Sequence, residues 1–278
     1  MKIAISSETA IDLSKDLLKK YDISTIAFGI NFNGELVSDK EGISKEIFEF
    51  VEKSKALPKT SAVSPEQFRE YFEGLKKKYD AVVHISIGGE LSCTYNNARL
   101  VAEDLENVYV VDSKNLSTGI ALLAIKAREF ANAGKTPEEV YNMTLECVDK
   151  VQASFVLERL NYLYKGGRCN ALTLLGANLL KIKPQIVVEN GRMGVGKKYR
   201  GNINKVADQY CEDILVEYPN ADKSCVFVTH SSEMPEAEKA IEERLKKAGF
   251  ETIYNTTAGG TVCSHCGPDT IGVLFINK

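Results

Sequence analysis

The 278-residue chain contains no tryptophan, only seven prolines and only three histidines. It has no apolar run near the roughly 20 residues that a membrane-spanning helix needs. Its first residues read directly as a short strand, without the apolar region of a signal peptide. Neither sign of charge dominates, because 35 basic and 38 acidic residues leave a net charge of −3. These absences exclude a disordered or collagen-like chain, predict that no segment spans a membrane, and argue against general nucleic-acid binding.

The seven cysteines are odd in number and irregular in spacing, which is not typical of a secreted disulfide framework. They are Cys93, Cys147, Cys169, Cys211, Cys225, Cys263 and Cys266. We therefore expect reduced thiols and a cytoplasmic protein. The Cys-x-x-Cys pair around His265 leaves a thiol or metal module as one alternative. No second pair of ligands stands at a suitable spacing, so we expect no metal. A redox Cys-x-x-Cys normally opens a helix, which Gly267-Pro268 disfavours, so we also do not expect thiol chemistry.

Short β-rich runs alternate with longer helical patterns along the whole chain, which predicts an α/β protein with much parallel sheet. The expected strands cover residues 2–6, 24–32, 35–37, 81–86, 107–111, 154–158, 185–189, 225–230, 252–256 and 271–276. The expected helices cover residues 12–21, 64–78, 172–181, 205–217 and 236–247, and one more begins at Thr136. Asn33-Gly34 predicts a hairpin between two of the strands.

The length leaves room for two domains. We expect residues 1–152 to form an N-terminal α/β domain with a largely parallel, Rossmann-like sheet. Residues 153–278 are expected to form a smaller α/β domain with a mixed sheet. No shift in composition marks the boundary between them.

Several polar groups follow predicted strands, where ligands gather in open α/β sheets. They are residues 6–9 (Ser-Ser-Glu-Thr) after the first strand, residues 60–61 (Thr-Ser) in an expected loop, and residues 91–95 (Leu-Ser-Cys-Thr-Tyr) after Gly88-Gly89. Hydroxyls and backbone N–H groups at such a helix start favour an anion, although each group could equally serve as a helix cap. His265 is expected in a Gly/Pro loop before the last strand, where residues more often serve a site.

The charge is distributed unevenly. Residues 165–200 contain eight basic residues and one acidic residue, so this segment carries +7 and the rest of the chain −10. Glycines interrupt the basic residues at 166–167 and at 194 and 196. We interpret these stretches as flexible basic loops, which suit an anionic ligand or an acidic partner surface.

Taken in order, these blocks resemble the DegV family of bacterial fatty-acid-binding proteins, which includes the FakB subunits of fatty acid kinase. The resemblance covers essentially the whole chain. The matching blocks lie at residues 60–64, 91–95, 111–114, 166–168, 182–184, 198–201 and 265–268.

The resemblance implies two α/β domains that clasp one long-chain fatty acid. It implies that Thr60 and Ser92 hydrogen-bond the carboxylate and that His265 approaches it from the second domain. The residues expected around this group are Ser61, Cys93 and Thr94. Two hydroxyl donors and a histidine can satisfy a carboxylate.

The resemblance also implies a protein with no catalytic residues and no cofactor of its own, serving phospholipid metabolism. A separate ATP-dependent fatty acid kinase would convert the bound acid to an acyl phosphate. Arg168, together with Lys198 and Arg200, would form part of the surface that faces this kinase or its phosphate.

The chain departs from the family pattern in three places. Residues 8–10 (Glu-Thr-Ala) stand in place of Asp-Ser-Thr, and Cys93 and Asp269 each stand in place of a usual glycine. We expect Cys93 to narrow the site or change the turn. Asp269 is expected to place a negative charge near the carboxylate, which would raise the pKa of the acid or favour a different ligand head group.

The enzyme alternative is a hydrolase or acyltransferase with Ser92 as nucleophile and His265 as base. Ser92 lacks the Gly-x-Ser-x-Gly pattern of a nucleophile elbow, and the sequence shows no group that orients His265. Binding without catalysis is therefore the leading interpretation.

Overall fold

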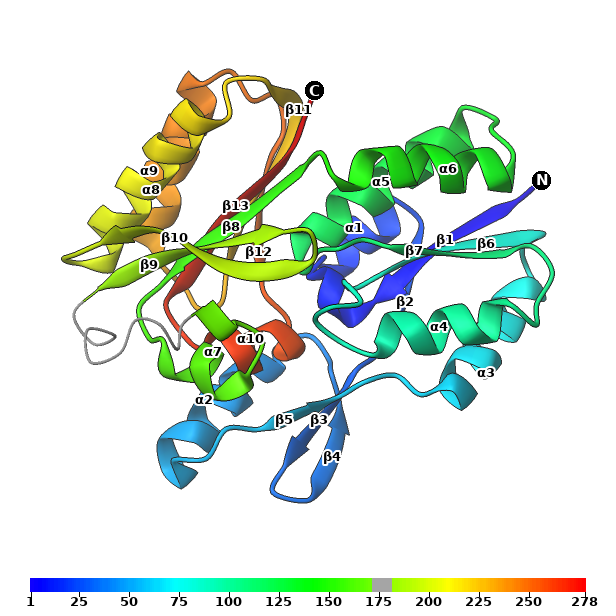
Figure 1. The fold of residues 1–278 in the computed structure, drawn as a ribbon, viewed down its shortest axis with the longest axis horizontal. Helices are drawn as coiled ribbons and strands as arrows, with labels where there is room; N and C mark the ends of the chain where they lie inside the picture. Colours follow the sequence, from blue (N-terminus) through cyan, green and yellow to red (C-terminus); the bar gives the residue numbers. More distant parts are fainter. Residues whose placement is uncertain (172–181) are drawn as a thin grey trace.

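The computed structural model describes residues 1–171 and 182–278, so the helix expected over residues 172–181 lies outside the described residues. The N-terminal half is built on a parallel sheet of four strands in the order β2-β1-β6-β7 (Figure 1). Its strands are β1 (Ile3–Glu8), β2 (Ile23–Ile26), β6 (Ala81–Ser86) and β7 (Val108–Asp112). Every residue of β1 and β6 is buried, as expected for parallel strands covered on both faces.

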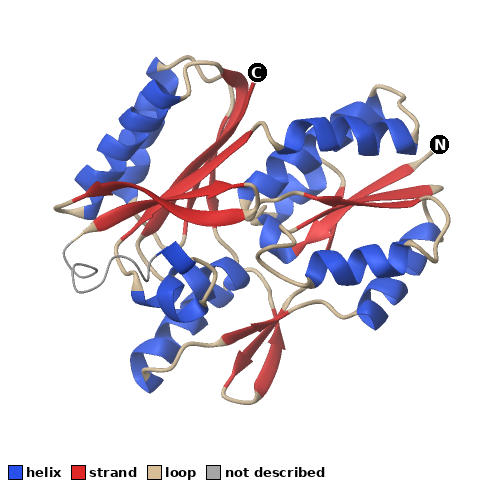
Figure 2. Ribbon diagram, in the orientation of Figure 1, coloured by secondary structure: helices blue, strands red, loops and turns tan. Residues whose placement is uncertain are grey.

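Helices cover both faces of this sheet (Figure 2). They are α1 (Lys15–Lys20), α5 (Thr118–Asn132) and α6 (Pro137–Val148) on one face, and α3 (Pro65–Lys76) and α4 (Thr94–Ala102) on the other. The predicted starts of α3 and α6 are confirmed, because Ser64 and Thr136 each form a capping box with the residue three positions later.

A mixed sheet of six strands forms the C-terminal half, in the order β10-β9-β8-β13-β11-β12. Its strands are β8 (Val151–Leu157), β9 (Lys183–Glu189), β10 (Arg192–Tyr199), β11 (Ala221–His230), β12 (Ile253–Thr257) and β13 (Thr270–Asn277). Only the β11–β12 pair is parallel. Helices α8 (Ile203–Glu217) and α9 (Pro235–Lys247) pack on one face. The predicted α/β class, with a parallel first sheet and a mixed second sheet, is confirmed.

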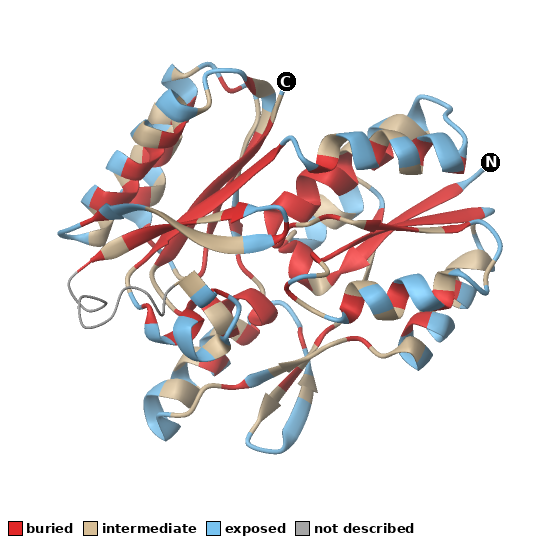
Figure 3. Ribbon diagram, viewed as in Figure 1, coloured by how far each residue is buried: buried red, intermediate tan, exposed pale blue. Residues whose placement is uncertain are grey.

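The two halves share one hydrophobic core. Helix α5 contacts β1 and β6 of the first sheet and β8, β11 and β13 of the second. Ile5 and Val83 of the first sheet lie in the same buried cluster as Phe155 and Leu274 of the second. The buried positions in Figure 3 accordingly follow both large sheets and the helix between them. The division of the chain into two domains near residue 152 stays a prediction.

A third, antiparallel sheet was not expected. It contains β3 (Gly29–Phe32), β4 (Glu35–Ser38) and β5 (Lys59–Ser61), and helix α2 (Ile43–Ser54) connects β4 to β5. The predicted hairpin is confirmed, because Asn33 and Gly34 join β3 to β4 with positive φ values of 52° and 108°.

The single strand expected over residues 24–32 is wrong. The chain leaves the parallel sheet after Ile26 and enters the small sheet at Gly29. Phe28 turns into the core with 3% exposure, and its N–H donates to the Thr9 hydroxyl rather than to a strand. Asp39 N–H donates to the carbonyl of Phe28.

Two other expectations about local structure are wrong. His265 does not lie in a Gly/Pro loop but on helix α10 (Gly260–Cys266), which ends at Gly267 where φ is 76°. The glycines at 194 and 196 belong to strand β10 and not to a flexible loop, because the strand pairs with β9 across a bulge. The Gly-Pro pair after α10 and the glycines and basic residues within β10 are typical of loops. Local patterns therefore did not predict either element.

Helix α10 comes from the C-terminal half but packs on the N-terminal half. It contacts α2, β3, β5 and the short helix η1 (Thr9–Ile11), as well as α7 (Asn161–Gly166) (Figure 1). Within residues 1–171 and 182–278, no helix has both the length and the apolar character needed to cross a bilayer.

Candidate functional site

A cavity of about 190 Å³ lies where the two halves meet. Its walls come from β5 and α10, from the turns after β6 and α7, and from β10. Most of the wall is apolar, with polar atoms gathered at a few residues. The polar or thiol-bearing members of the wall are Thr60, Ser92, Cys93, Arg168, Thr261, His265 and Cys266.

Thr60 and His265 meet across the boundary between the halves. The Thr60 Oγ1 atom lies 2.9 Å from Nε2 of His265, although 205 positions separate the two residues in sequence. Thr60 is on strand β5, where it pairs with Ile30 of β3, so the loop expected at this position is a strand. The structure therefore brings together two of the three predicted carboxylate ligands.

The His265 imidazole is partly buried, and its Nδ1 atom has no hydrogen-bond partner among the described residues. Burial, together with the positive charge of Arg168, lowers the pKa of His265 to about 4. The ring is therefore neutral near pH 7. A neutral ring has one N–H to donate and one nitrogen free to accept.

Ser92 lies on the same cavity wall, in the turn that leads into α4. Its Oγ atom is 2.9 Å from the Thr94 hydroxyl and accepts a bond from the Thr94 N–H at 3.2 Å. The turn is tight, because the N–H groups of Leu91 and Ser92 both donate to the carbonyl of Gly88. Hydroxyls at 92 and 94 thus gather at one point, as the sequence predicts.

The backbone conformation at position 93 does not require glycine, although the family pattern has glycine there. Its φ is −69° and its ψ is −3°, an ordinary conformation for any residue. The thiol is exposed and lies on the cavity wall. A cysteine therefore fits this turn without backbone strain, and its side chain lines the cavity; whether the turn differs from that of the family stays a prediction.

Arg168 reaches the cavity, whereas Lys198 and Arg200 do not. The Arg168 guanidinium donates to the carbonyls of Gly166 at 2.7 Å and of Leu91 at 3.4 Å, and no acidic side chain among the described residues pairs with it. Lys198 is exposed near the far end of β10, roughly 16 Å along the strand from Met193, the cavity-lining residue of that strand, and Arg200 is exposed just beyond the strand.

Much of the remaining charge in residues 165–200 is neutralised locally. Lys183 pairs with Glu158 at 2.6 Å, and Arg192 pairs with Glu90 at 3.1 Å. Lys197 pairs with Asp213 at 3.2 Å. The net +7 of this segment therefore overstates the free positive charge, and Arg168 is the cation that faces the cavity.

Asp269 lies outside the cavity. Its φ is 57°, which explains why a glycine suits this position, and its carboxylate accepts from the Ser232 hydroxyl at 3.1 Å. It borders a separate surface hollow with Glu158 and Arg159. The expectation that Asp269 adds a negative charge at the ligand carboxylate is wrong.

Ser61 pairs with Gly29 in the small sheet but is not part of the cavity wall.

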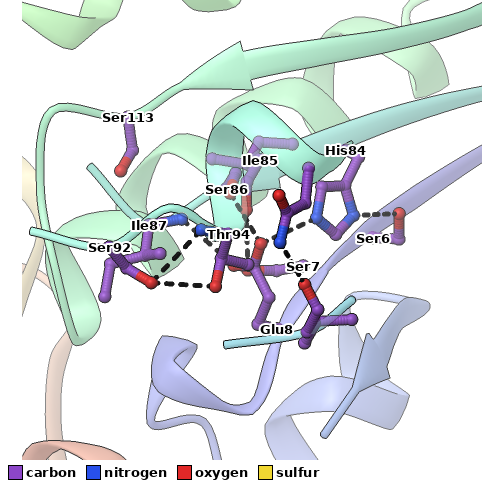
Figure 4. A network of polar contacts seen from close by, with 12 residues as sticks. Ser6, Ser7, Glu8, His84, Ile85, Ser86, Ile87, Ser92, Thr94 and Ser113 are labelled. Atoms are coloured by element: carbon purple, nitrogen blue, oxygen red, sulfur yellow. Dashed lines mark hydrogen bonds and ion pairs between the residues drawn. The ribbon is translucent and has the colours of Figure 1, made fainter. Parts of the chain in front are cut away.

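The residues at 6–9 also lie outside the cavity wall, because they form the end of β1 and the start of η1 rather than a turn open to a ligand. Glu8 is fully buried and accepts from the Ser86 hydroxyl at 2.6 Å and the Ile87 N–H at 3.0 Å. His84 lies 3.0 Å from it, so this network ties β1 to β6 (Figure 4).

A second, apolar chamber adjoins the cavity, and the two share Leu116, Val262 and Cys266. The chamber, of about 30 Å³, lies between α10 and the second sheet, with Phe155 and Leu274 in its wall. Together they offer a polar mouth and an apolar interior.

The arrangement does not support the hydrolase alternative. His265 hydrogen-bonds to Thr60 and Ser92 to Thr94, so the proposed base does not contact the proposed nucleophile. A base of this kind also needs a group that orients it, and Nδ1 of His265 has no such partner in the described part of the chain.

The thiol alternative is also unsupported. Cys263 and Cys266 lie in the last turns of α10, and burial raises the pKa of Cys266 to about 12 and that of Cys263 well above its ordinary value. The reactive thiolate forms are therefore disfavoured. No group of three or more metal-ligating side chains occurs in residues 1–171 and 182–278.

Known proteins match this chain over essentially its full length. The sequence model of the family described as "Uncharacterised protein, DegV family" matches residues 2–278. The "Fatty acid-binding protein" of Thermotoga maritima is 30% identical over 98% of this chain and 96% of its own. The structure titled "Fatty Acid Binding of a DegV family Protein from Thermus thermophilus" has a TM-score of 0.92 at 25% identity, with both chains covered completely. A stearic acid-binding protein from Eubacterium ventriosum has a TM-score of 0.82 at 26% identity over 100% of this chain and 98% of its own.

Proposed function

We propose that this chain, which belongs to the DegV family, binds one long-chain fatty acid between its two halves. The observation that carries the proposal is the contact between Thr60 and His265, at the polar mouth of a cavity that continues into an apolar chamber. A fatty acid has the same polarity, with one charged end and a long apolar tail.

The carboxylate is bound at the mouth. Nε2–H of neutral His265 donates to the Thr60 oxygen, so that the Thr60 hydroxyl hydrogen is free to donate to the ligand. The Ser92 hydroxyl, which lines the same cavity, supplies a second donor. Arg168 adds a positive charge that no acidic side chain of the described residues offsets, which strengthens the attraction for an anion.

The acyl chain occupies the apolar part of the cavity and extends toward the chamber that adjoins it. Each methylene removed from water contributes about 0.8 kcal/mol, so the tail supplies most of the affinity while the head group fixes the orientation. The relatives named above, described as fatty acid-binding or stearic acid-binding proteins, support this class of ligand.

The protein itself does not catalyse a reaction under this proposal. It presents the carboxylate, in the cytoplasm, to a separate ATP-dependent kinase, which transfers a phosphoryl group from ATP to a carboxylate oxygen and releases ADP. Arg168, which faces the cavity, meets the phosphate, and Lys198 and Arg200, which are exposed farther along the chain, contact the kinase at a distance from the cavity.

Binding of oleate to the purified protein tests the proposed ligand. We expect Thr60→Val and Ser92→Ala each to weaken the affinity about tenfold, since each removes one hydrogen bond to a charged group. Ser232→Ala is the matched control, because its hydroxyl bonds to Asp269 outside the cavity. Failure of the wild type to bind oleate, or equal affinities for all variants, would contradict the proposal.

The kinase partner is tested separately with Arg168→Ala. We expect this variant to yield less acyl phosphate when it is mixed with the kinase and ATP at saturating oleate. Lys19→Ala, on the exposed surface of α1 and outside the cavity wall, serves as the control. Unchanged acyl phosphate formation by Arg168→Ala would remove this residue from the partner surface.

A further inference from the structure

Two buried aspartates of the N-terminal half bind the start of α10, the helix that carries His265. Asp39 follows strand β4 and Asp12 follows η1, and each is 4% exposed. The cavity wall described above includes neither of them. Their role toward the site is therefore indirect.

Asp39 accepts three hydrogen bonds from α10. Its Oδ1 atom accepts from the Gly260 N–H at 2.9 Å, and its Oδ2 atom accepts from the N–H and the hydroxyl of Thr261 at 2.9 and 2.6 Å. The hydroxyl of Thr9 also donates to Oδ2 at 3.2 Å. Because all four groups donate, a carboxylate can accept from all of them and an amide cannot.

Asp12 completes the contact one residue earlier. Its Oδ1 atom accepts from the Gly259 N–H at 2.8 Å, and its Oδ2 atom accepts from the Ser117 hydroxyl at 2.5 Å. The first N–H groups of a helix have no partners within the helix, so these two aspartate side chains satisfy donors that burial would otherwise leave unpaired.

The packing leaves α10 little freedom to move while these bonds are present. A β-carbon at Gly260 would lie 2.4 Å from side-chain atoms of both Ile30 and Ile43, and 2.8 Å from the Asp39 carboxylate. The helix backbone therefore rests directly on β3 and α2. Ile30 is the residue that pairs with Thr60 in the small sheet.

We propose that Asp39, assisted by Asp12, is a positioning residue that holds α10 on the N-terminal half and so sets the place of His265 opposite Thr60. The inference rests on the proposed function for its consequence in fatty acid binding. Asp39 itself touches neither the ligand nor the imidazole. It acts through the helix that it caps.

The short length of α10 makes this connection direct. From Gly260 to His265 the helix rises only about 8 Å. A helix of seven residues has little stability of its own, so its position depends on its caps and its packing. A change at its first turn is therefore transmitted to the imidazole in its last turn.

The test compares Asp39→Ala and Asp39→Asn by two measurements. The first is the ¹⁵N chemical shift of the His265 imidazole without ligand, and the second is the affinity for oleate. We expect Asp39→Ala to move the His265 resonance and to weaken oleate binding about tenfold. Asp39→Asn keeps one acceptor, so we expect changes in the same direction but smaller.

Tyr210→Phe is the control for a purely structural effect. Its buried hydroxyl donates to the Ser154 carbonyl at 2.6 Å and accepts from the Val273 N–H at 3.1 Å, within the C-terminal sheet and away from α10. We expect this variant to lose stability while the His265 resonance stays unchanged.

The outcomes separate the two proposals. If the His265 resonance in folded Asp39→Ala matches that of the wild type, the positioning role is wrong. If Asp39→Ala does not fold, Asp39→Asn decides the question by the same measurement. If the wild type binds no oleate, the proposed function fails, and the His265 resonance still tests the positioning role.

Discussion

Gly166 lies against the His265 imidazole. A β-carbon at position 166 would be 2.6 Å from Nδ1 of His265, closer than real side chains approach one another. The Gly-Gly-Arg block therefore has two functions in this chain: its first glycine leaves room for the histidine, and its arginine brings a positive charge to the cavity.

The first prediction concerns this contact. We expect Gly166→Ala to weaken fatty acid binding about tenfold, because either α7 or the imidazole must move and the contact with Thr60 would be disturbed. Alanine is favoured over glycine in a helix by about 1 kcal/mol, so the loss of affinity should occur without a comparable loss of stability. Calorimetric titration with oleate and urea denaturation measure the two quantities.

Gly74→Ala is the matched control for that variant. Gly74 is in α3, and no atom lies within 4 Å of a β-carbon added there. We expect unchanged affinity and a gain in stability of about 0.5–1 kcal/mol. Equal oleate affinity of Gly166→Ala and the wild type would show that His265 does not depend on this space.

The second prediction concerns the titration of His265. Burial and Arg168 lower the pKa of His265 to about 4, whereas an unfolded histidine takes up its proton near pH 6.5. The unfolded state therefore binds the proton first as the pH falls, so stability present above pH 6.5 is lost toward pH 4. A bound carboxylate favours the imidazolium, so we expect oleate to raise the pKa of His265.

Imidazole resonances recorded from pH 7.5 to pH 4 check this prediction, with and without oleate. His265→Gln identifies the resonance among those of the three histidines. An unliganded pKa of His265 near its ordinary value, or no upward change on binding oleate, would contradict the described environment.

The third prediction concerns Asp12. Burial, with the charge of Asp39 as a smaller contribution, raises the pKa of Asp12 from 3.8 to about 8. The folded state therefore keeps a proton that the unfolded state has released, and this contribution to stability decreases as the pH rises from about 4 to about 8.

Asp12→Asn removes that dependence, because asparagine mimics the protonated acid and tolerates the positive φ of 55° at this position. We expect its free energy of unfolding, relative to that of the wild type, to increase between pH 5 and pH 8 in urea denaturation. A constant difference across this range would show that Asp12 does not titrate there.

The fourth prediction uses the exposed thiol of Cys93 at the cavity mouth. We expect iodoacetamide to alkylate Cys93 ahead of the buried cysteines, bound oleate to slow this reaction, and the alkylated protein to bind oleate weakly. Mass spectrometry of tryptic peptides follows the modification. Cys93→Ser should keep binding oleate after the same treatment, and an alkylation rate indifferent to oleate would place the ligand elsewhere.

Sequence patterns predicted those helix starts and turns that interactions between neighbouring residues determine. The capping boxes at Ser64 and Thr136 and the Asn33-Gly34 turn depend on neighbouring residues, and the structure confirms them. The blocks around Thr60, Ser92 and His265 predicted three side chains that the fold places on one cavity wall.

Other features depend on contacts between distant segments, which no local pattern reveals. Asp39 binds residues 221 and 222 positions away, and nothing in its own neighbourhood distinguishes it from the other acids of the chain. Helix α10 is short and bounded by glycines, so its propensity is low and its helical state comes from capping and packing. The separation of Arg168 from Lys198 and Arg200 likewise follows from the length of β10.

The most direct test of the account is native mass spectrometry of the purified protein, with lipid extraction of the same sample and with oleate added in excess. We predict a complex of one fatty acid per chain, carried through purification or formed on addition, that Thr60→Val and Ser92→Ala weaken. A protein that carries no fatty acid after purification and forms no complex with added oleate would contradict the central claim.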